Sequence, residues 1–292
     1  MRSIFKGSVV AIVTPFNENG SIDFDTLEKL VEWHIESGTN AILPCGTTGE
    51  SPTLSHEEHD LVIEQVVKFV NNRVPVLAGA GSNSTAEALR LTKHAEKCGA
   101  DGALVITPYY NKPTQAGLLA HFKKIASETN IPIVIYNVPG RTGISIAPDT
   151  VAELAKLNNI VAIKEASGSL DQASSILTKC NIDLLSGDDS LTVPLMSIGG
   201  CGVISVVANI VPEKTAALTA AMMKGNLPAA EQLHRELYPL CKAMFIETNP
   251  IPVKTALAIM GKIKEVYRLP LVPISDKNKE FLKSVMEKAG IL

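Results

Sequence analysis

The sequence predicts a closed (β/α)8 TIM barrel followed by a C-terminal helical extension. Eight short apolar runs recur along the chain, and an amphipathic stretch follows most of them. The runs are nearly continuous in Val, Ile, Leu and Ala, as in parallel strands that are covered on both faces. They recur about every 20–35 residues, which is the size of a βα unit. A doubly wound open sheet is the alternative, and the number of units favours the barrel.

The individual elements follow from local patterns. The predicted strands cover residues 9–15, 41–45, 76–80, 103–107, 133–137, 161–164, 184–187 and 202–207. A serine followed three residues later by Glu or Gln has the pattern of a capping box and predicts helix starts at Ser55, Ser84 and Ser169. Pro148 stands where a first helical residue is expected, before an apolar stretch that ends near residue 157.

The pattern changes after the eighth predicted strand. From residue 212 to the end, only helical periodicity remains, interrupted by several prolines. An eighth barrel helix and a small helical extension account for this change. We therefore expect a catalytic barrel at residues 1–225 and a helical extension at residues 226–292.

Composition excludes several classes of function. The chain has 292 residues, of which 46% are hydrophobic and 20% charged, so disorder is excluded as the dominant state. The net charge of −3 gives no basic excess for binding nucleic acid. The apolar runs are much shorter than the ~20 residues of a membrane span, and residues 1–7 do not resemble a signal peptide.

Cysteine usage predicts a cytoplasmic protein without a bound metal. The five cysteines are odd in number and form no C-x-x-C pair, which argues against a disulfide framework or a thiolate zinc site. His56 and His59 are three residues apart rather than the four of the H-E-x-x-H motif. Asp188 and Asp189 could suggest a cation site, but a helix N-cap explains them as well. We expect neither a metal nor a cofactor.

Lys164 and Tyr136 are the strongest catalytic candidates, because each closes an apolar strand at the end where barrel active sites lie. A lysine in a desolvated pocket has a lowered pKa, and the neutral amine can attack a carbonyl to form a Schiff base. A lysine that reaches solvent or pairs with Glu165 is the alternative. The Tyr136 hydroxyl could transfer protons to and from a carbinolamine, or could make a structural hydrogen bond only.

Two loops offer groups that bind carboxylates. Residues 46–50 read Gly-Thr-Thr-Gly-Glu, so backbone N–H groups and hydroxyls can converge on an anion, although an ordinary turn has the same composition. Arg141 lies in the loop after Tyr136, where its guanidinium could bind a substrate carboxylate in a forked geometry or remain on the surface.

Together these motifs resemble the dihydrodipicolinate synthase family. The resemblance rests on residues 46–50, on residues 136–143 (Tyr-Asn-Val-Pro-Gly-Arg-Thr-Gly) and on residues 164–168 (Lys-Glu-Ala-Ser-Gly). It extends from residue 7 to about residue 264 and includes Glu-Thr-Asn-Pro-Ile-Pro-Val-Lys at residues 247–254. The family members are lyases that condense pyruvate with aspartate 4-semialdehyde on the route to diaminopimelate and lysine.

The resemblance implies a catalytic set. Lys164 would form the Schiff base with pyruvate, and Tyr136 would be the proton donor and acceptor. Thr47 would link Tyr136 to Tyr110 of a neighbouring subunit in a homotetramer built from two tight dimers. The substrate-binding groups would be the Thr48 side chain for the pyruvate carboxylate, the Arg141 side chain for the semialdehyde carboxylate, and the backbone carbonyl of Ile204 beside the lysine.

The same resemblance implies an allosteric site at which lysine inhibits the enzyme. The matching positions are Ser51, His56, His59, Asn83, Glu87 and Tyr109. Pro52 stands where well-known bacterial members have alanine, which leaves that backbone contact open. A structural interpretation also accounts for part of the set: Glu87 belongs to a capping-box pattern, and the two histidines would occupy an exposed helix face.

Three alternative functions are compatible with some of the same residues. N-acetylneuraminate lyase and 2-keto-3-deoxy-gluconate-type aldolases share the lysine and the tyrosine. Arg141 within Gly-Arg-Thr-Gly, and a Thr-Thr pair at residues 47–48 in place of Ser-Thr, favour the synthase. A non-catalytic, effector-binding barrel is a third reading, and the presence of all expected catalytic residues argues against it.

Overall fold

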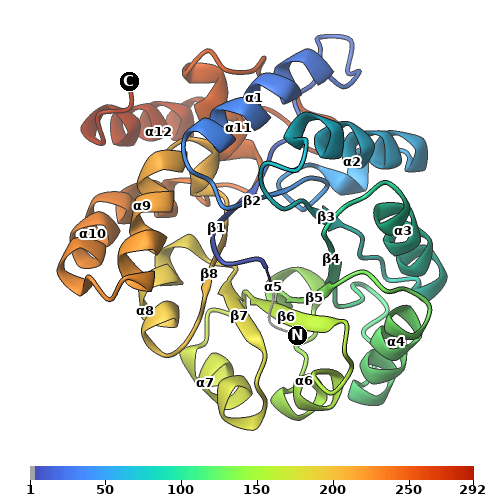
Figure 1. The fold of residues 1–292 in the computed structure, drawn as a ribbon. Helices are drawn as coiled ribbons and strands as arrows, with labels where there is room; N and C mark the ends of the chain where they lie inside the picture. Colours follow the sequence, from blue (N-terminus) through green and yellow to red (C-terminus); the bar gives the residue numbers. More distant parts are fainter. Residues whose placement is uncertain (1–3) are drawn as a thin grey trace.

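The computed structural model describes residues 4–292, in which eight parallel strands form a ring surrounded by helices (Figure 1). Residues 1–3 belong to the segment in which we expect no signal peptide, and they lie outside the described residues. The strands are β1 (Gly7–Ala11), β2 (Ala41–Leu43), β3 (Leu77–Gly79), β4 (Gly102–Ile106), β5 (Ile133–Asn137), β6 (Ile160–Glu165), β7 (Asp183–Ser186) and β8 (Gly202–Ser205).

The strand order settles the choice between a barrel and an open sheet. The sheet runs β2-β1-β8-β7-β6-β5-β4-β3, with every pairing parallel. A parallel bridge between Ile42 and Val76 joins its two ends, and the N–H of Ile42 donates to Pro75 O at 3.0 Å. The predicted TIM barrel is therefore confirmed, and the open sheet is wrong.

Helices cover the outside of the barrel and form the extension. The barrel helices are α1 (Phe24–Glu36), α2 (His56–Val70), α3 (Thr85–Lys97), α4 (Gln115–Ser127), α5 (Pro139–Thr142), α6 (Pro148–Leu154), α7 (Leu170–Lys179), α8 (Thr192–Ser197) and α9 (Pro212–Met223). The extension contributes α10 (Leu227–Ala243), α11 (Ile251–Ile259) and α12 (Asp276–Lys288). Short 3-10 turns occur at η1 (Ser51–Thr53), η2 (Asp189–Leu191) and η3 (Val207–Asn209). Among residues 4–292, no helix is long and apolar enough to cross a membrane.

Helix starts follow the sequence signals, with two corrections. Backbone N–H groups at the helix starts donate to all three predicted cap hydroxyls, those of Ser55, Ser84 and Ser169. Glu58 completes a capping box by accepting from its cap residue's N–H at 2.9 Å, and Pro148 begins α6. The other two boxes are wrong in their second half, because the side chains of Glu87 and Gln172 make other contacts.

The first strand is shorter than its apolar run predicts. β1 ends at Ala11, although the sequence indicates a strand to residue 15. The reason is a side chain from η3: Val13 N donates to Asn209 Oδ1 at 3.1 Å, and Asn209 Nδ2 donates to Ala11 O at 2.8 Å. An amide therefore replaces the neighbouring strand as the hydrogen-bond partner of this segment.

Alternation along the strands divides the core into two layers. One cluster fills the barrel interior, with Val134 from β5 and Ala162 from β6. The other lies between strands and helices and includes Ile135 and Ile163. Because side chains alternate between the two faces, residues 136 and 164 project into the barrel interior.

Candidate active site

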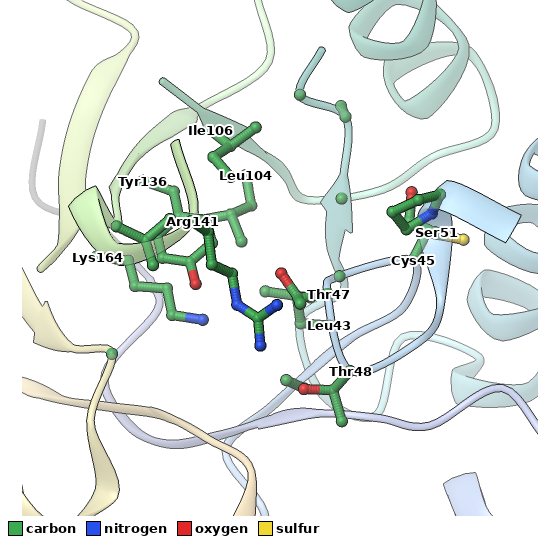
Figure 2. A pocket seen from close by; sticks show the side chains of 18 of the residues that line it. Leu43, Cys45, Thr47, Thr48, Ser51, Leu104, Ile106, Tyr136, Arg141 and Lys164 are labelled. Atoms are coloured by element: carbon green, nitrogen blue, oxygen red, sulfur yellow. The ribbon is translucent and has the colours of Figure 1, made fainter. Parts of the chain in front are cut away.

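A cavity of about 400 Å³ opens at the carboxyl ends of the strands (Figure 2). Many of the predicted site residues line it: Thr47, Thr48, Ser51, His56, His59, Glu87, Tyr109, Tyr136, Arg141 and Lys164. Three predicted residues, Asn83, Tyr110 and Ile204, are not among its lining residues. Most of the catalytic and allosteric candidates thus line the same cavity.

Lys164 lies on β6 beside Tyr136 of β5, in register. Its side chain is buried, and burial lowers the pKa of its ammonium from 10.5 to about 8, while Asp189 and Asp188 partly oppose this change. Gly187 leaves room for the lysine stem, because a Cβ there would lie 3.1 Å from Lys164 Cε. The arrangement presents a partly neutral amine to the cavity, as a nucleophile requires.

The Tyr136 ring lies close to the amine. Lys164 Nζ is 4.2 Å from the ring centroid (Figure 2). Burial raises the pKa of Tyr136 to about 12, although Arg141 and a hydrogen bond with Thr47 oppose the rise. The phenol therefore keeps its proton at neutral pH and can donate it beside the lysine.

Asn249 joins the two groups that are predicted to bind carboxylates. Its Nδ2 donates to Thr48 Oγ1 at 3.0 Å, and its carbonyl oxygen accepts from Arg141 Nη2 at 3.2 Å. Asn249 is 5% exposed and lines the cavity. The sequence analysis gave it no role, although it lies within the motif at residues 247–254.

Asp188 stands at the N-cap position of η2, as one interpretation suggested, but its side chain makes no capping hydrogen bond. Asp189 Oδ2 instead accepts from Val206 N at 3.0 Å and Val207 N at 2.9 Å, at the end of β8. Both carboxylates act on Lys164 electrostatically, and burial raises their own pKa values.

Tyr110 is exposed, whereas Ile204 is buried in the barrel. Tyr110 is 89% exposed and has a φ of +71°, a left-handed conformation that non-glycine residues rarely adopt. Its side chain is therefore open to contact from outside its own chain. Ile204 is fully buried on β8, paired in register with Val9, and belongs to the interior cluster.

Two of the predicted allosteric residues, His56 and Glu87, belong to one polar group. His56 Nε2 lies 3.2 Å from Glu87 Oε1, and Arg90 Nη2 donates to His56 Nδ1 at 3.0 Å. Ser82 Oγ donates to the Glu87 carboxylate. The exposed-face interpretation is wrong for His59, which is buried and whose pKa burial lowers to about 4. Asn83 accepts through its backbone oxygen from Asn111 Nδ2 at 2.9 Å.

A buried ion pair fixes the loop at residues 46–50. Lys254 of α11 donates to Glu50, and neither side chain is exposed. Glu50 also accepts from Arg268 N at 3.3 Å, and Lys254 Nζ lies 4.3 Å from the ring centroid of Phe16. The C-terminal extension therefore anchors the loop that carries the two threonines.

Comparisons with known proteins agree with this geometry. Residues 4–289 match the Dihydrodipicolinate synthetase family. The 4-hydroxy-tetrahydrodipicolinate synthase of Thermodesulfovibrio yellowstonii is 58% identical over 99% of this chain and 100% of its own length.

Two solved structures share the fold closely. The chloride-inhibited dihydrodipicolinate synthase from Acinetobacter baumannii, complexed with pyruvate, has a TM-score of 0.97 and 47% identity, covering 98% of this chain and 99% of its own. The enzyme from Cyanidioschyzon merolae, with lysine bound, has a TM-score of 0.96 and 41% identity over the whole of both chains. The resemblance predicted from the sequence is confirmed: the chain belongs to the dihydrodipicolinate synthetase family.

Proposed function

We propose that the chain acts as a 4-hydroxy-tetrahydrodipicolinate synthase, a lyase of the diaminopimelate route to lysine. It condenses pyruvate with L-aspartate 4-semialdehyde and needs no cofactor for this chemistry. The observation that carries the proposal is the buried Lys164 amine, 4.2 Å from the centre of the Tyr136 ring, in the cavity at the carboxyl ends of the strands.

The first half of the reaction activates pyruvate. The neutral Nζ of Lys164 attacks the keto carbon and forms a carbinolamine. Tyr136 donates a proton to the departing hydroxyl, water leaves, and an imine remains. Thr48 holds the pyruvate carboxylate, with its hydroxyl oriented by Asn249. Loss of a proton from the pyruvate methyl group then gives the enamine.

The second half forms the new carbon–carbon bond. The enamine carbon attacks the aldehyde carbon of the semialdehyde, whose carboxylate Arg141 binds. The semialdehyde amino group next attacks the imine carbon, closes the ring and releases Lys164. The arginine favours this acceptor over the sugar-derived substrates of sister aldolases, which have no carboxylate at that position.

The proton relay requires a second subunit. We propose that Thr47 links Tyr136 to Tyr110 of the partner subunit, and that the enzyme is a homotetramer built from two tight dimers. Support comes from the placement of Tyr110, which is 89% exposed, in a left-handed conformation, and outside the lining of its own cavity. The Ile204 carbonyl completes the surroundings of the amine.

Lysine is the proposed allosteric inhibitor. The Glu87 carboxylate pairs with the effector's ammonium group, and His56, His59, Ser51, Asn83 and Tyr109 complete the site. Support comes from the cavity that most of these residues share with Lys164, and from the lysine bound to the relative from Cyanidioschyzon merolae. Glu87→Gln should weaken lysine inhibition and leave turnover without lysine unchanged; unchanged inhibition would remove Glu87 from the site.

The proposed setting of the enzyme is the cytoplasm, where its thiols remain reduced. We also propose the division into a catalytic barrel at residues 1–225 and an extension at residues 226–292. The division falls at the turn around Gly225, whose φ is +69° between α9 and α10.

Borohydride trapping tests the function. The protein is incubated with pyruvate and borohydride, its intact mass is measured, and the modified peptide is sequenced. We expect one reduced pyruvyl group on Lys164, no adduct on Lys164→Ala, and consumption of aspartate 4-semialdehyde by the untreated enzyme. A folded protein without an adduct would refute the mechanism.

A further inference from the structure

A buried amide–carboxylate pair lies directly behind the two catalytic residues. The register of β5 and β6 places Tyr136 beside Lys164 and, one step further, Asn137 beside Glu165. Side chains alternate along a strand, so the first pair faces the barrel interior and the second faces the helices. Both outer residues are buried, with 0% of Asn137 and 3% of Glu165 exposed.

Hydrogen bonds fix the outer pair completely. Asn137 Nδ2 donates to both carboxylate oxygens of Glu165, at 3.1 and 3.0 Å. Asn137 Oδ1 accepts from Ile146 N at 3.1 Å, and Glu165 Oε1 accepts from Ser167 N at 2.7 Å. Because the backbone N–H of Ile146 can only donate, the atom that faces it is the amide oxygen, which leaves the Asn137 NH2 group toward Glu165.

Burying the Asn137–Glu165 pair opposes folding, so stability alone does not explain why it is there. Within residues 4–292, Glu165 makes no ion pair, and its partners are neutral N–H donors. Burial raises the pKa of its carboxyl group, while these hydrogen bonds oppose the rise. Burying a carboxylate without a cation costs more than an apolar contact of the same volume. Glu165 directly follows the reactive lysine on β6, where a fixed strand position would hold the Lys164 amine beside Tyr136.

The Asn137–Glu165 hydrogen bonds connect the carboxyl ends of β5 and β6. The pairing of β5 with β6 shifts register between Ile133 and Val134, so the ladder is irregular near its start. The outer pair then joins the two strand ends and the loops that follow them, which begin at residues 138 and 166. A change in either strand end would move the 4.2 Å contact between Lys164 Nζ and the Tyr136 ring.

We propose that Asn137 and Glu165 are positioning residues that set the placement of Tyr136 relative to Lys164, and thereby the rate of imine formation. They touch no substrate. The inference rests on the proposed function and adds to it two residues on the opposite face of the same strands.

The test measures how fast the imine forms. Each protein is mixed with pyruvate, quenched with borohydride at set times and weighed by mass spectrometry, and kcat and KM are then measured with both substrates. Asn137→Ala and Glu165→Ala should slow trapping about 10- to 100-fold and lower kcat, with little change in the KM for pyruvate. Glu165→Gln keeps an acceptor oxygen for Asn137 and should recover most of the rate.

Asn159 provides a matched control at the other end of the same strand. Its Nδ2 donates to Ala126 O and Thr129 O, both at 3.0 Å, just before β6 begins. Asn159→Ala therefore removes two side-chain hydrogen bonds to the backbone, without touching the far end of the strand. It should lower the melting temperature as Asn137→Ala does, yet trap pyruvate at the wild-type rate.

Each other outcome has a distinct meaning. Wild-type trapping by Asn137→Ala, or equal slowing by Asn159→Ala, would overturn the positioning role. Glu165→Gln as slow as Glu165→Ala would show that the charge matters and not the placement. Absence of an adduct on the unmodified enzyme would overturn the proposed function itself. If Asn137→Ala is recovered unfolded, Asn137→Ser carries the same expectation.

Discussion

Replacing Lys164 by Met should stabilise the folded enzyme while abolishing imine formation. Burial lowers the pKa of Lys164 from 10.5 to about 8 in the folded state, whereas the unfolded chain keeps the ordinary value. At about 1.4 kcal/mol per pKa unit, the protonated lysine therefore costs about 3 kcal/mol of stability at neutral pH. Methionine fills a similar volume without a charge, so the variant should regain most of this free energy.

The pH dependence has a defined sign. Below pH 8, both states of the wild-type protein hold the proton and the full cost is present. Between pH 8 and 10.5, the folded state has lost its proton while the unfolded state retains it, so wild-type stability rises with pH. The advantage of Lys164→Met should accordingly shrink across this range, because only the wild-type protein has a lysine that titrates there.

Urea unfolding of both proteins at pH 7 and pH 10 measures the effect. We expect a difference in unfolding free energy of about 3 kcal/mol at pH 7 and a much smaller one at pH 10. Lys164→Arg, which retains a cation at every pH, is the control. The difference in unfolding free energy between Lys164→Met and Lys164→Arg should be the same at pH 7 and pH 10. Equal stability of Lys164→Met and wild type at pH 7, or an advantage that does not change with pH, would refute the reasoning.

Three further outcomes are expected. Arg141→Ala should form the pyruvate adduct normally but turn over the semialdehyde about 100-fold more slowly, because the acceptor carboxylate loses its forked partner; unchanged turnover in a coupled assay would exclude that role. Tyr110→Phe should lower kcat without a change in melting temperature, since the side chain is 89% exposed; fully active monomers, sought by sedimentation during assay, would contradict the shared relay. Lys254→Met should lower the unfolding free energy by about 3–5 kcal/mol by stranding the buried Glu50, and adding Glu50→Leu should restore most of it, as denaturant titration would show.

The strands could be predicted because their signal is local. β5 begins at Ile133 and ends at Asn137, as its apolar run indicates. β1 was predicted to extend too far because nothing in residues 12–15 shows that Val13 finds its partner in Asn209. An apolar run indicates that a segment is buried, whereas the length of a strand depends on whether a neighbouring strand supplies the hydrogen-bond partners of its backbone.

The site residues that could be predicted are likewise those with a local sequence signal. Lys164 and Tyr136 could be found because a polar residue at the end of a buried strand has a visible pattern. Asn249 could not be given its role, because it meets Thr48 across 201 residues of sequence. Glu87 was assigned to a local capping box, and the structure instead turns its carboxylate toward His56. Local rules fail wherever a distant partner competes for the same polar atom.

Burial alone does not identify a nucleophile, as the two buried lysines demonstrate. Burial lowers the pKa of both, yet Lys254 is paired with Glu50, lies over two aromatic rings and does not line the cavity. Glu50 partly opposes the fall in its pKa, and the hydrogen bond to that carboxylate occupies the amine away from the cavity, so it cannot reach a substrate carbonyl. Lys164 is also desolvated, but the two carboxylates near it act only through space, and its amine lines the cavity. Pyruvate and borohydride should therefore modify Lys164 and leave Lys254 untouched, and an adduct on Lys254 would show that desolvation suffices without access.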